Sequence, residues 1–184
     1  MPADVVDEIE ELLSGVRRRA VPERELTTVL FTDIVSSTRQ AAALGDRSWR
    51  ALLDRHDDLT AQLVDAFRGR VVKRTGDGVF ATFDGPGRAV ECGNALCTAM
   101  RHIGLAIRAG VHTGEVERRG DDLGGIAVHI GAHIAAAAGP DEVLVSHTVR
   151  DLVAGSGITF ESKGHHPLKG LAEEWELFTA EVRT

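Results

Sequence analysis

Two apolar segments that each lead to an aspartate constrain this chain more than any other feature. In Val29–Thr38, apolar residues lead to Asp33 and then to a hydroxyl-rich stretch. In Val71–Phe80, Asp77 lies between two glycines. Both patterns predict a strand followed by a tight turn or a helix start. Mg²⁺ prefers oxygen ligands and takes few of them from protein when phosphates and water supply the rest. We therefore expect these segments to present both carboxylates to a magnesium–phosphate group.

The size and charge of the chain narrow the remaining possibilities. Its 184 residues, 43% of them hydrophobic, are enough for one complete core and few for two domains. The net charge of −7 argues against a nucleic-acid partner, because such proteins present a basic face. No apolar run is long enough to predict a membrane span. Cys92 and Cys97 lack metal-ligand spacing, so we expect buried free thiols in a reducing cytoplasm.

Residues 1–25 are predicted to form a helix and a linker. Apolar residues from Val5 to Leu13 fall at helical spacing, and Gly15 stands where a helix C-cap would be. So short a helix with an apolar stripe needs a surface to pack on. We therefore expect this segment to be the join to an upstream domain, with a plain surface helix as the alternative. Residues 26–184 are expected to form the catalytic unit.

Residues 26–184 show strand and helix patterns in the order βαββαβ, followed by further helices and strands. This order favours an α+β sandwich with helices on one face of the sheet. Residues 117–125 are rich in charge and glycine and are predicted to be a loop. The predicted strands are 26–33, 70–75, 79–83, 105–112, 142–146, 158–163 and 174–182; the predicted helices are 36–67, 89–103, 126–138 and 148–153.

Two other motifs are less informative. Residues 76–81 match the GxGxxA dinucleotide fingerprint, but a strand-like pattern follows where the fingerprint needs a helix. His129 and His133 have the spacing of a zinc pair. However, Ile130 stands where a metalloprotease would have its glutamate, and the sequence offers no clear third ligand, so zinc is not favoured.

Three segments resemble the signatures of class III nucleotidyl cyclases of bacterial type, the catalytic domain of adenylyl and guanylyl cyclases. They are Leu30–Ile34, Lys73–Gly78 and Leu168–Gly170. The similarity extends from about Leu26 to Glu181, with the motifs in family order. The resemblance implies a ferredoxin-like core and conversion of ATP or GTP to the 3′,5′-cyclic nucleotide with release of pyrophosphate. It also implies a head-to-tail homodimer with sites built across the interface.

The resemblance assigns several residues to metal and phosphate binding. Asp33 and Asp77 match the metal-binding aspartates, and the backbone carbonyl of Ile34 would help to hold the second ion. Two divalent cations, Mg²⁺ or Mn²⁺, can activate the ribose 3′-hydroxyl and neutralise the triphosphate. Lys169, before Gly170, matches the lysine that contacts the β- and γ-phosphates. The alternatives are an N-cap Asp33, a turn Asp77 and an exposed loop Lys169.

Two further residues match the positions that contact the purine. Lys73 matches the family lysine, and Asp122, seven residues before His129, matches an aspartate or threonine. An ammonium can donate to N1 of adenine, and a carboxylate can accept from the 6-amino group. Guanine reverses both demands, so this pair implies ATP. Asp121 leaves the assignment of Asp122 open by one position, and a solvated loop charge is the alternative.

The chain departs from the family pattern at His129 and His133. Most of the family has an asparagine that orients the ribose at the first position and an arginine that stabilises the transition state at the second. Only imidazolium replaces the guanidinium charge, and unperturbed imidazole is mostly neutral at pH 7. The sequence therefore predicts a cytoplasmic, homodimeric, metal-dependent adenylyl cyclase of low turnover. The alternatives are a nucleotide-binding regulatory module with little or no activity, and a guanylyl cyclase.

Overall fold

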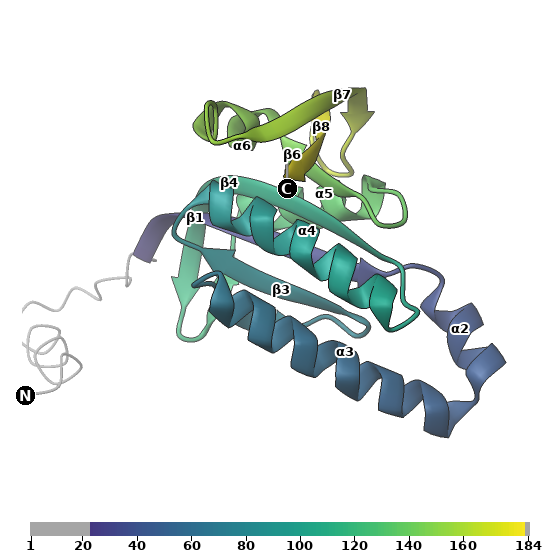
Figure 1. Ribbon diagram of the computed structural model, residues 1–184. Coiled ribbons are helices and arrows are strands. Elements are labelled where there is room, and N and C mark those ends of the chain that lie inside the picture. The colour runs from purple at the N-terminus through teal and green to yellow at the C-terminus, as the bar shows by residue number, and fades with distance from the viewer. Residues whose placement is uncertain (1–22, 183–184) are drawn as a thin grey trace, which may run out of the picture.

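An eight-stranded sheet is the framework of the computed structural model, which describes residues 23–182 (Figure 1). Its strands are β1 (Glu23–Ile34), β2 (Arg70–Arg74), β3 (Gly78–Phe83), β4 (Ile107–Arg119), β5 (Asp122–Gly124), β6 (Val143–Ser146), β7 (Ile158–Pro167) and β8 (Glu174–Val182). They are ordered β2-β3-β1-β4-β6-β8-β7, and β5 pairs with β4 off this path. β1 begins three residues before its predicted start at Leu26. The helix expected within residues 1–25 lies outside the described residues.

The first four long strands and the helices between them form the predicted ferredoxin-like core. The core helices are α2 (Ser37–Leu44), α3 (Asp46–Ala66) and α4 (Pro86–His102). Two more helices follow the core, α5 (Ile126–Ala137) and α6 (His147–Leu152). α3 and α4 cover one face of the sheet, where their apolar stripes meet side chains such as Leu30 and Phe83. The α+β class and the βαββαβ core are confirmed, and further elements follow them as expected.

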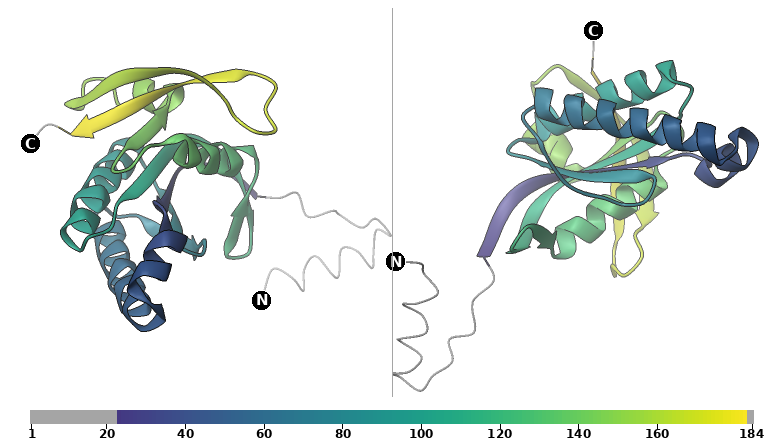
Figure 2. Two further views of the ribbon diagram at one scale, coloured as in Figure 1. Left: turned by 90° about the vertical axis from the view of Figure 1, so that its right-hand side faces the viewer. Right: turned by 90° about the horizontal axis from the view of Figure 1, so that it is seen from below.

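Helix α5 lies on the opposite face of the sheet, so the expectation that all helices share one face is wrong (Figure 2). Side chains alternate along β1, and Val29 and Phe31 therefore point toward α5 while Leu30 points toward α4. Gly110 and Gly131 allow the close contact of α5 with the sheet. A Cβ on Gly110 would lie 2.2 Å from the backbone nitrogen of Ala135.

Two segments differ locally from their predicted form. The helix predicted to run to Phe67 is divided at Gly45, whose φ of 75° ends α2 before α3 begins. The apolar spacing continues across this glycine, which is why periodicity alone joined the two helices. Residues 117–125 contain the end of β4 and all of β5, a hairpin rather than a loop. In β5 only Leu123 is buried, so the segment has too few apolar residues to show the alternation that predicts a strand.

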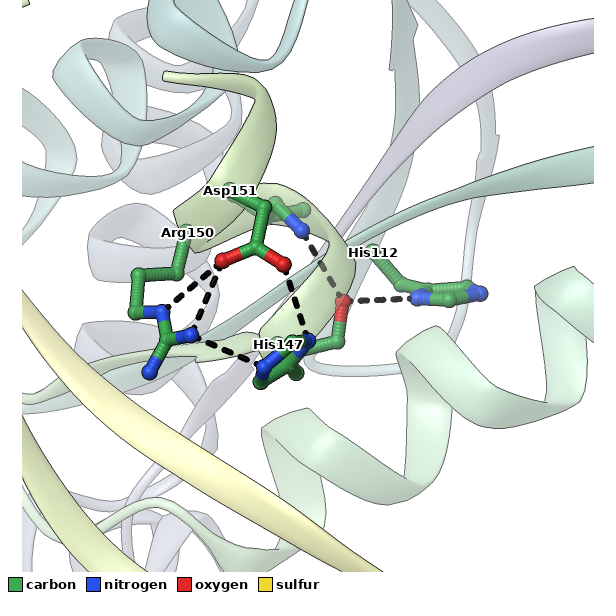
Figure 3. A network of polar contacts seen from close by, with 6 residues as sticks. His112, His147, Arg150 and Asp151 are labelled. Atoms are coloured by element: carbon green, nitrogen blue, oxygen red, sulfur yellow. Dashed lines mark hydrogen bonds and ion pairs between the residues drawn. The ribbon is translucent and has the colours of Figure 1, made fainter. Parts of the chain in front are cut away.

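Helix α6 is attached to the sheet through polar contacts (Figure 3). The Ser146 hydroxyl caps the helix by accepting from the Val149 N–H at 3.4 Å, and a 2.8 Å hydrogen bond joins it to Nδ1 of His112 on β4. On the outer side, the guanidinium of Arg150 lies 4.4 Å from the ring centre of Phe178 on β8. These contacts tie the C-terminal strands to the ferredoxin-like core.

The structure also answers two simpler expectations. Cys92 and Cys97 are both buried and unpaired, as predicted. Burial raises the pKa of each thiol to about 12. Within residues 23–182, no helix is long and apolar enough to cross a membrane.

Candidate active site

Two aspartates lie side by side where β1 ends and the β2–β3 turn closes. In the β1–β3 ladder, Asp33 is opposite Gly78, the residue that follows Asp77. The turn is tight because Gly76 adopts a φ of 82°. The turn lies so close to β1 that residue 78 must be glycine, since a Cβ on Gly78 would lie 2.0 Å from the carbonyl oxygen of Thr32. The fold thus brings the two predicted metal ligands together at the ends of the neighbouring strands β1 and β3.

The donors at these strand ends fit a hard divalent cation. Asp33 and Asp77 offer carboxylate oxygens, which Mg²⁺ and Mn²⁺ prefer. The side chain of Ile34 is a hydrocarbon without donor atoms and is buried in the core, so this residue could offer only its backbone carbonyl as a ligand. Within residues 23–182, no group of three or more His, Cys, Asp or Glu side chains could hold a metal ion.

Arg108 is a member of this site that the sequence analysis missed. It lies on β4 directly opposite Asp33 in the β1–β4 ladder. Its Nε donates to Oδ2 of Asp33 at 2.9 Å, and a terminal nitrogen donates to the same oxygen. The available signal was an arginine inside the otherwise apolar pattern from Leu105 to Val111.

Asp33 and Arg108 face a cavity of about 200 Å³ between the sheet and α5. Its polar wall comes from these two side chains and Thr75, and its apolar wall comes from α5 and Phe31. Phe31 stacks on Phe80 of β3 with 4.5 Å between the ring centres, and this contact stabilises the position of Phe31 in the wall. The lining residues are Phe31, Thr32, Asp33, Thr75, Arg108, Ala132, Ala135 and Ala136.

A second pair of predicted site residues is in direct contact. Nζ of Lys73 on β2 donates to Oδ1 of Asp122 on β5 at 2.8 Å. The β4–β5 hairpin brings the two together, because Leu123 packs into the same apolar cluster as Phe31 and Phe80. Between the adjacent carboxylates of Asp121 and Asp122, it is therefore Asp122 that contacts the lysine.

The surroundings of Asp122 keep its carboxylate ionised. The hydrogen bond from Lys73 is the largest cause that lowers its pKa, followed by the bond that the Leu123 N–H donates to the same oxygen. Both side chains of the pair are accessible, 48% exposed for Lys73 and 63% for Asp122. This ion pair is open to solvent, and a ligand can reach both groups.

The remaining predicted residues make no direct polar contact with these two pairs within residues 23–182. His129 is exposed and His133 half-buried on α5, and Lys169 is exposed after β7. Lys169 occupies a turn that is anchored by the buried Leu168 and in which Gly170 has a φ of 86°. Within residues 23–182, no hydrogen bond or ion pair joins these three side chains to the aspartates or to Lys73.

The sequence model described as "Adenylate and Guanylate cyclase catalytic domain" matches residues 20–181. This match covers most of the chain, and the chain belongs to that family.

Known proteins support the same assignment. A Rhizobium meliloti (strain 1021) protein provisionally named adenylate cyclase 3 is 32% identical over 165 residues, which are 85% of this chain and 28% of that protein. The chain thus spans less than a third of the length of this relative.

Solved structures share the fold. The adenylyl cyclase CyaB from P. aeruginosa superposes with a TM-score of 0.82 at 22% identity, covering 89% of this chain and 97% of that one. The guanylate cyclase domain of RhGC from Catenaria anguillulae, in complex with GTP, gives a TM-score of 0.80 at 17% identity, covering 88% of this chain and 100% of that one. The fold is therefore shared by a protein named as an adenylyl cyclase and by one named as a guanylate cyclase.

Proposed function

We propose that this chain is an adenylyl cyclase domain that converts ATP to 3′,5′-cyclic AMP and pyrophosphate. The observation that carries the proposal is the contact between Lys73 and Asp122, 2.8 Å apart. Two groups this close can form hydrogen bonds to adjacent atoms on the same edge of one purine. The ammonium donates to N1 of adenine, and the carboxylate accepts from the 6-amino group. Guanine offers a donor at N1 and an acceptor at position 6, so it meets donor with donor and acceptor with acceptor.

The exposure of the pair supports its exchange for a ligand. An exposed ion pair contributes little to stability, so its replacement by purine contacts costs little. The contact also orients both side chains before a purine arrives. Preorganised groups lose less conformational entropy on binding.

The two aspartates are assigned to the metals of the same reaction. Asp33, Asp77 and the Ile34 carbonyl would hold two divalent cations, Mg²⁺ or Mn²⁺, and Lys169 would bind the β- and γ-phosphates. When bound, the cations supply Lewis-acid activation of the ribose 3′-hydroxyl and neutralise phosphate charge. In the reaction, the ribose 3′-hydroxyl loses its proton to solvent water, its oxygen bonds to the α-phosphorus, and the bond from that phosphorus to the pyrophosphate oxygen breaks, so that pyrophosphate leaves.

We further propose that the working form is a head-to-tail homodimer. In this arrangement Asp33 and Asp77 of one protomer face Lys73 and Asp122 of its partner. His129 and His133 of the same partner would orient the ribose and stabilise the transition state. Because neutral imidazole lacks the charge of a guanidinium, this site is expected to turn over slowly.

A second candidate is a nucleotide-binding module that regulates a fused or separate partner without useful turnover. His129 and His133 favour this candidate, because they stand where most family members have asparagine and arginine. The two candidates differ in one measurable product. The adenylyl cyclase releases cyclic AMP, whereas the regulatory module binds ATP and returns it unchanged.

The deciding experiment compares ATP and GTP as substrates, each with Mg²⁺ and with Mn²⁺, and identifies the products by chromatography. Cyclic AMP from ATP, with at least tenfold higher kcat/KM than for GTP, is the expected result. Binding of ATP without product favours the regulatory module. Preferred formation of cyclic GMP would contradict the purine assignment.

Neighbouring carboxylates provide a matched control. Lys73→Ala and Asp122→Ala should each lower kcat/KM for ATP about 10- to 100-fold, the size of a lost charge-assisted hydrogen bond. Asp121→Ala removes an adjacent exposed carboxylate that does not contact Lys73. It should keep the activity of the natural chain. Equal losses in Asp121→Ala and Asp122→Ala would show that only the local charge matters.

A further inference from the structure

Arg108 is held between an anionic side chain and the end of a helix. Two of its nitrogens donate to Oδ2 of Asp33, and Nη1 donates to the carbonyl of Ala136 at 3.0 Å. Ala136 lies in the last turn of α5, where the helix dipole favours a cation. The guanidinium is therefore fixed by partners on β1 and on α5.

This arrangement places the two carboxylate oxygens of Asp33 in different surroundings. Oδ2 accepts two N–H groups from Arg108, while within residues 23–182 no hydrogen bond reaches Oδ1. The side chains are similarly accessible, 33% exposed for Arg108 and 32% for Asp33. The carboxylate consequently has one occupied oxygen and one available oxygen beside the 200 Å³ cavity.

We propose that Arg108 is the positioning residue of Asp33 and weakens the binding of a free divalent cation to this carboxylate. The inference rests on the proposed function, because that function gives Asp33 its metal. A divalent cation on Oδ1 would lie one carboxylate away from a fixed positive charge. Coulomb repulsion scales with the product of the two charges, so the guanidinium repels a divalent cation twice as strongly as a monovalent one. A polyanionic ligand that brings its own negative charge offsets this repulsion, so the site favours a cation that arrives with phosphate.

The same two strands contain a matched ion pair away from the site. Arg118 of β4 pairs with Glu25 of β1, and these side chains are 29% and 36% exposed. The Arg118–Glu25 pair thus has the same strands, the same chemistry and a similar exposure as the Arg108–Asp33 pair. Arg118→Gln therefore controls for the loss of one arginine and one ion pair.

The test is a titration of the full chain with Mn²⁺ alone, followed by electron paramagnetic resonance. Arg108→Gln should bind Mn²⁺ about tenfold more tightly than the natural chain, because the repulsion from the guanidinium is removed. Arg108→Lys keeps the charge and should stay within about threefold of the natural chain. Arg118→Gln should leave the affinity unchanged. Thermal unfolding of each variant verifies that it is folded.

Asp33→Asn shows whether the effect passes through Asp33. In that background Arg108→Gln should no longer change Mn²⁺ binding, because the two residues act as one unit. Unchanged or weaker Mn²⁺ binding in Arg108→Gln, or an equal gain in the Asp33→Asn background, overturns the inference. Tighter Mn²⁺ binding in a chain that forms no cyclic nucleotide supports the inference and contradicts the proposed function. If no form of the chain binds Mn²⁺, the metal assignment of Asp33 and this inference both fail.

Discussion

At the scale of single residues, Asp33 and Asp77 are expected to contribute more to the proposed site than to the stability of the fold. Both stand at strand ends, and Asp33 is one-third exposed. Asp33→Ala or Asp77→Ala should therefore abolish cyclic nucleotide formation while leaving the thermal unfolding midpoint within a few degrees of the natural chain. Asp84→Ala, at the other end of β3, is the control and should remain active. Near-normal turnover of either site variant with Mn²⁺ would contradict the metal assignment.

His112 makes the stability of the domain depend on pH. Burial lowers its pKa from 6.5 to about 4, so the folded chain keeps the imidazole neutral. Between these two pH values the unfolded chain binds more protons than the folded chain. The stabilising contribution is therefore fully present above pH 6.5 and is lost as the pH falls toward 4, by at most about 1.4 kcal/mol per pH unit.

Urea unfolding at pH values from 7 to 4.5 tests this effect. His112→Asn retains an amide that can bond to Ser146, and it should unfold with a shallower pH dependence than the natural chain. His102→Asn changes an exposed histidine at the end of α4 and should leave the slope as it is. Parallel pH profiles of the natural chain and His112→Asn would show that His112 does not titrate as inferred.

At the scale of elements, the contact between α5 and β1 depends on a glycine. A Cβ on Gly131 would lie 2.6 Å from Cγ2 of Val29, which is fully buried and cannot move aside. Gly131→Ala should therefore lower the free energy of unfolding by about 1–3 kcal/mol despite the better helix propensity of alanine. Gly87→Ala in α4 meets only Val153 at 4.0 Å and should be neutral or stabilising. Denaturant unfolding of both variants measures the difference, and equal stabilities would contradict this packing argument.

His129 and His133 on α5 are the residues from which we expect a low turnover of the proposed cyclase. If His133 takes the place of the transition-state arginine, the missing charge should cost on the order of 10²- to 10³-fold in turnover. His129→Asn with His133→Arg should therefore raise kcat more than it changes KM. Steady-state kinetics measures both constants, and His102→Arg controls for an added arginine on another helix. A folded double variant with unchanged kcat would remove both histidines from the proposed roles.

At the scale of the whole molecule, the proposed site requires residues from two protomers. An inactive Asp33→Ala chain mixed with an inactive Lys73→Ala chain should recover activity, because each heterodimer contains one intact site. Equal mixing of the chains of a twofold dimer predicts about a quarter of the natural activity. Asp33→Ala mixed with Asp77→Ala is the matched control and should stay inactive, since both changes affect the same half. Absence of recovery in heterodimers of proven composition would place each site within one chain.

Most local structure and the family were predictable from the amino-acid sequence. Apolar periodicity located the core strands and helices, because a side chain's burial repeats with the geometry of its own element. Glycine and aspartate in Gly76-Asp77-Gly78 located the hairpin that presents Asp77. The segments Leu30–Ile34, Lys73–Gly78 and Leu168–Gly170 carried the resemblance to cyclases, which the match over residues 20–181 confirms.

Only the tertiary structure decided which of these residues touch. Arg108 and Asp33 are 75 positions apart, and their ion pair depends on the register of β1 against β4. Lys73 and Asp122 are 49 positions apart and meet because the β4–β5 hairpin packs on the α5 face of the sheet. Periodicity records how each segment is buried, but not the segment against which it is buried. The amino-acid sequence by itself thus determined most of the elements and the candidate residues other than Arg108, and strand pairing determined the ion pairs at the site.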